Sequence, residues 1–416
     1  MGTRGEQSPL PEIEGAVADA GLIRPAEISS QQVNEEVGKQ ISSSDSNVVH
    51  VSSQTIRLSC LSTFLSALVL FIVFQLCLDR FSAQLQTLES MSYAFVREIV
   101  KSDTCVSSKI LCFGDSLVKM GVSPAILESF LKEPVCNLAV PGSRPSASYF
   151  ILRRALKTGA SPKAVLVDFE SGILRDDPCK AVHESAEFFG LDDCLDLAAV
   201  TRDFDYVSSL MAAVTVPSYR LKYPTCAALR RAFRLDGGID KKEILEYVSN
   251  WRNNRGQTLP PYSSPLQIEG NNKIVWKDII EKRVPWYCHP MNRVYLEQFI
   301  GLANKHGITV YWLLPPMHPA AQLELEKTGV DSAYCQFAAS MLKRFPNLRI
   351  VDGRHAHYGS ENFMGGCHLN RLGSMVYSAG LGELLTSQTP EIRRELSQRW
   401  LALPVYRRPE ASVTAD

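Results

Sequence analysis

Three short segments, far apart in the chain, carry residue types that together could perform acyl transfer on a serine. Ser116 lies in FGDSL, Gly142 in NLAVPGS and His368 in CHLNRLGS. A serine hydroxyl is a weak nucleophile until a base takes its proton, and histidine has a suitable pKa near neutrality. A glycine lets the backbone approach a substrate oxygen and donate its N–H. Each residue alone also fits a turn, a cap or a surface position, but the ordered set favours serine chemistry.

The residues between these segments predict an α/β fold, because short apolar runs alternate with segments of helical spacing. Ligand sites in such sheets form beyond the carboxyl ends of the strands, and Ser116 and Gly142 each follow a predicted strand. His368 precedes the last predicted helix. The expected strands are 109–113, 135–140, 163–169, 308–316 and 348–352, and the expected helices begin at Ser123-Pro124 and cover 147–159, 291–307, 332–345 and 370–385.

The chain outside this alternation divides into further segments. Residues 58–78 carry no charge and are long enough to cross a bilayer as a helix. A core helix would show a polar stripe, and a signal peptide would start nearer the N-terminus. We expect a disordered tail over 1–56, a transmembrane helix over 57–79, a stalk helix over 80–107, the α/β domain over 108–388 with a mostly helical insertion at about 174–288, and a basic tail over 389–416.

The three segments, taken in order, resemble the sequence blocks of SGNH/GDSL hydrolases. The likeness covers about 108–180 and 290–387, and it is greatest to the membrane-anchored branch that includes D-alanyl transfer and alginate O-acetylation proteins. It implies a three-layer, flavodoxin-like parallel sheet. It also implies Ser116 as nucleophile, the N–H groups of Ser116 and Gly142 in the oxyanion hole, and His368 as general base.

The sequence departs from that pattern at two places. The class commonly has an acid three positions before the histidine, where this chain has Gly365. Glu361 or Asp352 could orient the imidazole instead, or Ser116 and His368 could act as a dyad. The asparagine block that normally donates to the oxyanion is also missing. The third strand ends instead in VDFESG. There the hydroxyl of Ser171 could donate a weak hydrogen bond to the oxyanion, whereas an ionised Glu170 cannot donate one.

These observations predict a membrane-anchored esterase or O-acyltransferase that acts on an extracytoplasmic glycan or lipid-linked carbohydrate. A membrane protein that donates the acyl group is a possible partner. The alternative is a non-catalytic protein of the same fold that binds polysaccharide or scaffolds a membrane assembly. Lys+Arg and Asp+Glu balance at 44 each, which argues against nucleic acid. No cofactor is implied, and no metal either, since His355 and His357 lack accompanying ligands.

Overall fold

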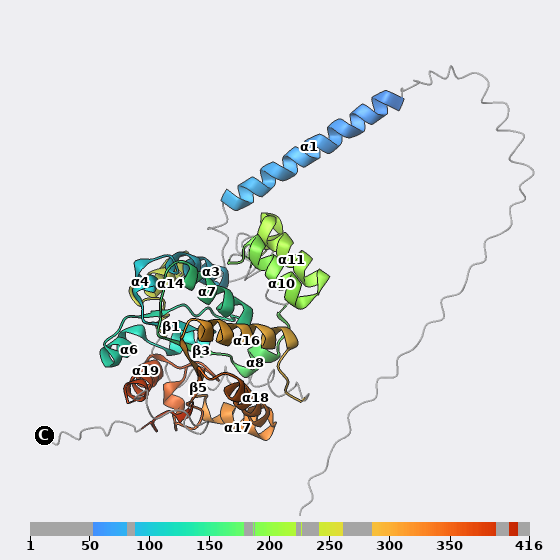
Figure 1. The fold of residues 1–416 in the computed structure, drawn as a ribbon. Coiled ribbons are helices and arrows are strands. Elements are labelled where there is room, and N and C mark those ends of the chain that lie inside the picture. The colour runs from blue at the N-terminus through green and yellow to red at the C-terminus, as the bar shows by residue number, and fades with distance from the viewer. Residues whose placement is uncertain are drawn as a thin grey trace, which may run out of the picture. The chain divides into compact units, whose positions relative to one another are not determined.

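The fold is described from a computed structural model of the chain (Figure 1). The structure describes residues 53–80, 88–178, 186, 188–221, 226, 241–260, 285–387 and 399–406. The strands are β1 Ile110–Phe113, β2 Val135–Asn137, β3 Ala164–Asp168, β4 Thr309–Leu314, β5 Leu348–Asp352 and β6 Trp400–Ala402. The helices between β1 and β5 are α5 Ser116–Gly121, α6 Pro124–Leu131, α7 Pro145–Lys157, α8 Ser171–Arg175, α10 Leu191–Thr201, α11 Phe204–Thr215, α12 Pro217–Arg220, α14 Lys241–Asn253, α16 Pro290–Lys305, α17 Pro319–Lys327 and α18 Val330–Arg344.

All six strands are parallel and form one sheet in the order β2-β1-β3-β4-β5-β6. The chain leaves β1 towards one edge of the sheet, and it returns past β1 to build the other side from β3 onwards. Two neighbouring strands whose connections leave in opposite directions form a crevice at their carboxyl ends, where α/β proteins bind ligands. Here the two strands are β1 and β3, so Ser116 follows a strand that borders this crevice.

Buried side chains alternate between the two faces of the sheet, as the period of a β-strand requires. In β1, Leu111 and Phe113 belong to the larger apolar cluster, while Ile110 and Cys112 belong to a smaller one. The larger cluster also takes side chains from α7, α16 and α18, and the smaller one from α5, α6 and α19 (Arg371–Thr386). Helices therefore cover both faces, and the sequence prediction of an α/β parallel sheet is confirmed.

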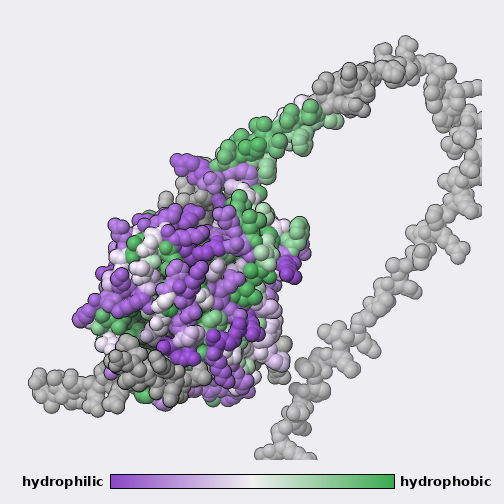
Figure 2. Space-filling model, in the orientation of Figure 1, coloured by the Kyte–Doolittle hydropathy of each residue, from purple (hydrophilic) through white to green (hydrophobic). Residues whose placement is uncertain are grey.

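The N-terminal part of the chain contains one long apolar helix. This helix, α1, covers Ser53–Arg80, and its segment Cys60–Arg80 is long and apolar enough to cross a membrane. From Cys60 onwards most of its apolar side chains are exposed, and this part of the helix is mostly green in Figure 2. The helix begins before the boundary at 57 that the sequence suggested. Residues 1–52 of the tail expected to be disordered over 1–56 lie outside the described residues, and residues 53–56 belong to α1, so this part of the expectation was wrong.

The segment over 80–107 is not one stalk helix, so this expectation was wrong. It contains α3 (Leu88–Ile99) and α4 (Asp103–Ser107), and residues 81–87 lie outside the described part of the chain. Tyr93, Phe95 and Val96 of α3 are buried in the larger core cluster. Helical spacing of apolar residues predicts an amphipathic helix but does not say what its apolar face will contact.

The proposed boundary of the α/β domain at 388 was also wrong. Residues Trp400–Ala402, assigned to a solvated basic tail, form β6 and pair with β5. Arg399 is buried, and its guanidinium donates to the carbonyls of Leu342 and Phe345. A short apolar run directly after an arginine gives little signal in the sequence. The described part of the insertion is mostly helical and includes α10, α11, α12 and α14, as expected.

Candidate active site

The structure brings Ser116 and His368 together across 252 residues of sequence. The Nε2 atom of His368 lies 2.8 Å from Oγ of Ser116. Both side chains are half-buried at the carboxyl end of the sheet. Burial lowers the pKa of His368, so its imidazole is neutral at pH 7 and can accept a proton from Ser116.

A tight strand-to-helix turn presents Ser116 to this edge. Gly114 has φ of 116°, a conformation that L-residues rarely adopt, and Asp115 caps α5 by accepting the N–H of Leu117 at 2.7 Å. Ser116 is therefore the first residue of α5. The N–H groups at the start of a helix have no partner within it, so that of Ser116 is available to an oxyanion.

Asp168, at the end of β3, stabilises this turn by a hydrogen bond to its backbone. Its Oδ1 accepts the N–H of Asp115 at 3.0 Å, and a Cβ at Gly114 would come within 1.6 Å of the same oxygen. Both carboxyls are fully buried. Burial raises the pKa of Asp115 to about 6 and, together with the charge of Asp115, raises the pKa of Asp168 well above its usual value. Sequence reasoning noticed Asp168 only as part of VDFESG and gave it no role.

Gly142 lies at the same end of the sheet as Ser116. The segment after β2 continues alongside β1, since the N–H of Val140 donates to the carbonyl of Gly114 at 3.0 Å. Gly142 follows in a turn closed by the N–H of Ser143 and the carbonyl of Val140, with φ of 67°. Its exposed backbone is open, because a Cβ there would meet no atom within 4 Å. Its position is compatible with an oxyanion donor.

A short hairpin loop carries His368. Phe363 and Leu369 form an antiparallel bridge, and the N–H of Met364 donates to the carbonyl of His368 at 3.0 Å. Asn370 then caps α19 by accepting the N–H of Gly373 at 2.9 Å. The bridge and the cap fix the backbone on both sides of His368.

A thiol, not a carboxylate, faces the other nitrogen of the imidazole. Sγ of Cys367 lies 3.5 Å from Nδ1 of His368, and burial raises the pKa of this thiol to about 12, so it stays uncharged. The structure does not bring either proposed acid to His368. Asp352 accepts hydrogen bonds from Arg354 and Trp400, and Glu361 is exposed, with its backbone carbonyl bonded to Asn370.

At the position where SGNH/GDSL hydrolases commonly have an acid, the backbone conformation favours glycine. Gly365 has φ of 153°, which residues with a side chain rarely adopt, although no atom would crowd a Cβ there. The hairpin around Gly365 and Cys367 therefore follows a path that favours glycine three residues before the histidine.

The segment after β3, where SGNH/GDSL hydrolases have an asparagine that donates to the oxyanion, provides no such side-chain donor from Glu170 or Ser171. The hydroxyl of Ser171 donates its single proton to Oε1 of Glu170 at 3.2 Å, and Oε2 of Glu170 caps α8 by accepting the N–H of Ile173 at 2.9 Å. Ser171 is thus not an oxyanion donor in this arrangement.

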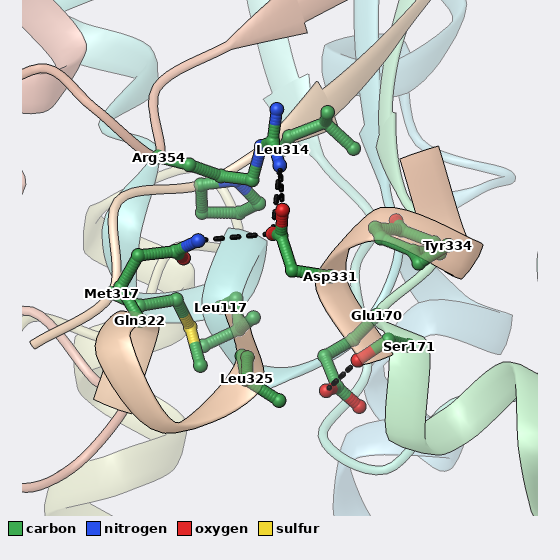
Figure 3. A pocket seen from close by; sticks show the side chains of 11 residues that line it. Leu117, Glu170, Ser171, Leu314, Met317, Gln322, Leu325, Asp331, Tyr334 and Arg354 are labelled. Atoms are coloured by element: carbon green, nitrogen blue, oxygen red, sulfur yellow. Dashed lines mark hydrogen bonds and ion pairs between the residues drawn. The ribbon is translucent and has the colours of Figure 1, made fainter. Parts of the chain in front are cut away.

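A small pocket lies next to this site, bordered by residues that follow β1, β3, β4 and β5 (Figure 3). Leu117, next to Ser116 in the chain, forms part of its wall, as do Glu170 and Ser171. Among the residues the structure describes, no group of three or more potential ligands could hold a metal ion. His355 approaches Glu326 at 3.7 Å.

The sequence matches no protein-family model and no curated protein. Arguments about function therefore depend on the geometry of the site.

Proposed function

We propose that this chain is a membrane-anchored serine esterase or O-acyltransferase of the SGNH/GDSL type, which acts on an extracytoplasmic glycan or lipid-linked carbohydrate. The observation that carries the proposal is the 2.8 Å contact between Oγ of Ser116 and Nε2 of His368. The strand order, which begins 2-1-3-4-5 as in flavodoxin-like sheets, and the position of Ser116 beside the β1–β3 crevice support it.

The chemistry follows from the positions of the two side chains. His368 takes the proton of Ser116 as Oγ attacks the acyl carbonyl carbon, and the N–H groups of Ser116 and Gly142 donate to the oxygen that becomes negative. His368 then gives the proton to the leaving alcohol. Water or a sugar hydroxyl attacks the acyl-enzyme in the same way, and the identity of that second acceptor separates an esterase from a transferase.

The proposed location follows from α1. Its segment Cys60–Arg80 would anchor the chain in a bilayer by one span, with the α/β domain on the extracytoplasmic side, beside membrane-linked substrates. A membrane protein that supplies the acyl group would be the natural partner of a transferase, since the soluble domain would then only pass the group on.

The full-length chain in detergent micelles tests the proposal with p-nitrophenyl acetate and a fluorophosphonate probe. The probe requires only an activated serine, so it reports on Ser116 even if catalysis needs an acyl-donating partner. We expect Ser116→Ala to abolish labelling, and Ser116→Ala and His368→Ala to reduce kcat/KM by at least about 10³-fold.

Two substitutions serve as matched controls. Ser123 precedes α6 without a side-chain capping bond, and the side chain of His355 is 61% exposed. Ser123→Ala and His355→Ala should label and turn over like the wild type. A folded wild type that neither labels nor hydrolyses the ester contradicts the catalytic proposal. It would favour the alternative, a non-catalytic protein of this fold that binds polysaccharide or scaffolds a membrane assembly, to which the uncharged partner of His368 already points.

A further inference from the structure

The pocket beside Ser116 has a size that limits what it can hold. It lies where β3, β4 and β5 end, and Leu117 connects its wall directly to Ser116 (Figure 3). Its volume is about 40 Å³, on a scale on which one water molecule needs roughly 10–15 Å³. The space therefore takes about three or four groups of the size of a methyl or methylene.

The walls of the pocket suit an alkyl group. Leu117, Leu314, Met317 and Leu325 present aliphatic side chains to it. The ring of Tyr334 also borders it, while the tyrosine hydroxyl donates to the carbonyl of Phe169 at 2.6 Å. Because that polar atom is already satisfied, the ring acts as apolar surface.

An ion pair closes one side of the pocket. Nη1 of Arg354 lies 2.7 and 2.6 Å from the two carboxylate oxygens of Asp331, and Nε2 of Gln322 donates to Asp331 at 2.9 Å. Figure 3 shows these three side chains together, away from Glu170 and Ser171. A longer chain would have to break this half-buried network, which leaves charges without partners, so the network limits chain length.

Glu170 gives the opposite side of the pocket a carboxylate. Glu170 and Leu117 line the same pocket, and Leu117 directly follows Ser116 in the chain. Burial is the main cause of the raised pKa of both Asp115 and Cys367, and the charge of Glu170 adds to each. An acyl group with its own carboxylate would be repelled there.

We infer that this pocket receives the acyl chain, and that the protein handles short, uncharged acyl groups of about two to four carbons. The inference depends on the proposed function. Oγ of Ser116 bonds to the acyl carbonyl carbon as the bond to the leaving alcohol breaks, and the serine proton passes through Nε2 of His368 to that alcohol. The alkyl part of the bound acyl group then occupies the pocket next to Leu117.

Chain-length profiles of the full-length protein in detergent test this inference. The substrates are p-nitrophenyl acetate, butyrate, octanoate and hemisuccinate, and kcat/KM is measured for each. The variants are Leu325→Ala, which opens the pocket, and Leu325→Phe, which fills it. Leu323→Ala is the matched control, because Leu323 lies on the same helix α17 but is 48% exposed, whereas Leu325 is 8% exposed. Ratios between substrates within one preparation cancel the fraction of folded protein.

We expect the wild type to accept acetate and butyrate and to discriminate against octanoate and hemisuccinate by about 100-fold or more. Leu325→Ala should raise the octanoate-to-acetate ratio about tenfold or more, Leu325→Phe should reduce the butyrate-to-acetate ratio, and Leu323→Ala should change neither. Turnover with no chain-length preference, or an unchanged ratio in Leu325→Ala, overturns the inference alone. The absence of both turnover and Ser116 labelling overturns the proposed function and the inference with it.

Discussion

His368 has an unusual neighbour for a histidine that faces a serine hydroxyl. Its Nε2 faces Ser116, and Nδ1 faces the uncharged thiol of Cys367 at 3.5 Å. A thiol is a weak hydrogen-bond acceptor, so it can favour the tautomer with a proton on Nδ1, but it does not stabilise the imidazolium that forms during reaction. We therefore predict that a Ser116–His368 site with this thiol turns over more slowly than the same site with a carboxylate beside Nδ1.

Cys367→Asp tests this directly, because its carboxylate reaches one bond further towards Nδ1. In the wild type burial lowers the pKa of His368, so kcat/KM should hold constant at neutral pH and fall in acid with a midpoint below 6.5. An adjacent carboxylate favours the charged imidazole, so we expect this midpoint to rise by about 1 unit or more and kcat to increase about tenfold. Cys367→Ser, also uncharged, should keep the wild-type profile. Identical pH profiles for Cys367→Asp and wild type would show that Nδ1 is not coupled to position 367.

At the scale of elements, the site depends on how β3 supports the β1–α5 turn. Asp168 at the end of β3 accepts the N–H of Asp115, and Asp115 in turn caps α5. Two buried carboxyls this close hold protons that the unfolded chain releases, since both pKa values are raised. Stability from this pair is therefore present in acid and is lost as pH rises through the folded-state pKa values, from about 4 upwards past that of Asp115 at about 6.

Asp168→Asn should weaken this dependence, because the amide oxygen can still accept the N–H of Asp115 while the side chain cannot ionise, and only Asp115 is left to titrate. We expect the variant to match the wild type at pH 4 and to be more stable at pH 8, as measured by the free energy of urea unfolding across this range. Asp192→Asn, at an exposed position on α10, is the control and should not change the pH dependence. A variant that is less stable at pH 8 would mean that Asp168 is needed in its ionised form.

A buried lysine makes a second contact between elements. Lys119 of α5, three residues after Ser116, lies against α3 and α14. Nζ of Lys119 lies 4.9 Å from the ring centre of Trp251 in α14 and 5.3 Å from that of Phe95 in α3, with no hydrogen-bond partner among the described residues. Burial lowers the pKa of Lys119 to about 7. Folding therefore becomes more favourable as pH rises from about 7 towards the ordinary lysine value near 10.5.

Lys119→Met replaces the amine by an apolar side chain of similar length. We expect the variant to be more stable than the wild type at pH 7 and the difference to shrink towards pH 10, as read from unfolding free energies at both pH values. A variant less stable at pH 7 would indicate that the cation–π contacts outweigh the burial of the charge.

At the scale of the whole molecule, α1 is the feature that bears on where the protein is located. Its segment Cys60–Arg80 fits either an anchor that stays in the protein or a signal sequence that is removed, and we propose the anchor. With epitope tags at both ends, an anchor leaves both tags on one membrane-bound chain that resists carbonate extraction. A chain that has lost its N-terminal tag would identify a cleaved signal sequence.

Charges within the span should release the protein from the membrane. An arginine near the centre of a span costs about 2.5–3.5 kcal/mol, so the pair Leu68→Arg and Ile72→Arg should move the protein into the carbonate-soluble fraction. Leu195 and Phe204 are 62% and 82% exposed in the α/β domain. The same double change there should leave membrane association intact.

The sequence by itself determined the α/β class, the apolar helix and the choice of Ser116 and His368, whose side chains the structure brings into contact. Each of these depends on local information: a period of two or 3.6, a long uncharged run, or a strand followed by a tight turn. The alternation of strands and helices predicted five of the six parallel strands, and β6 was missed because Trp400–Ala402 is short. The order of Ser116, Gly142 and His368 along the chain was the reason to predict that they belong to one site.

Only the tertiary structure decided what surrounds the pair. The sequence offered Glu361 and Asp352 as partners of His368, but Asp352 is held by Arg354 and the imidazole faces Cys367. It also gave no reason to place Asp168 under the turn that carries Ser116. Such contacts join strands and loops that are distant in the chain, and they depend on register, backbone path and burial. None of these three quantities can be read from the spacing of residues within a single segment.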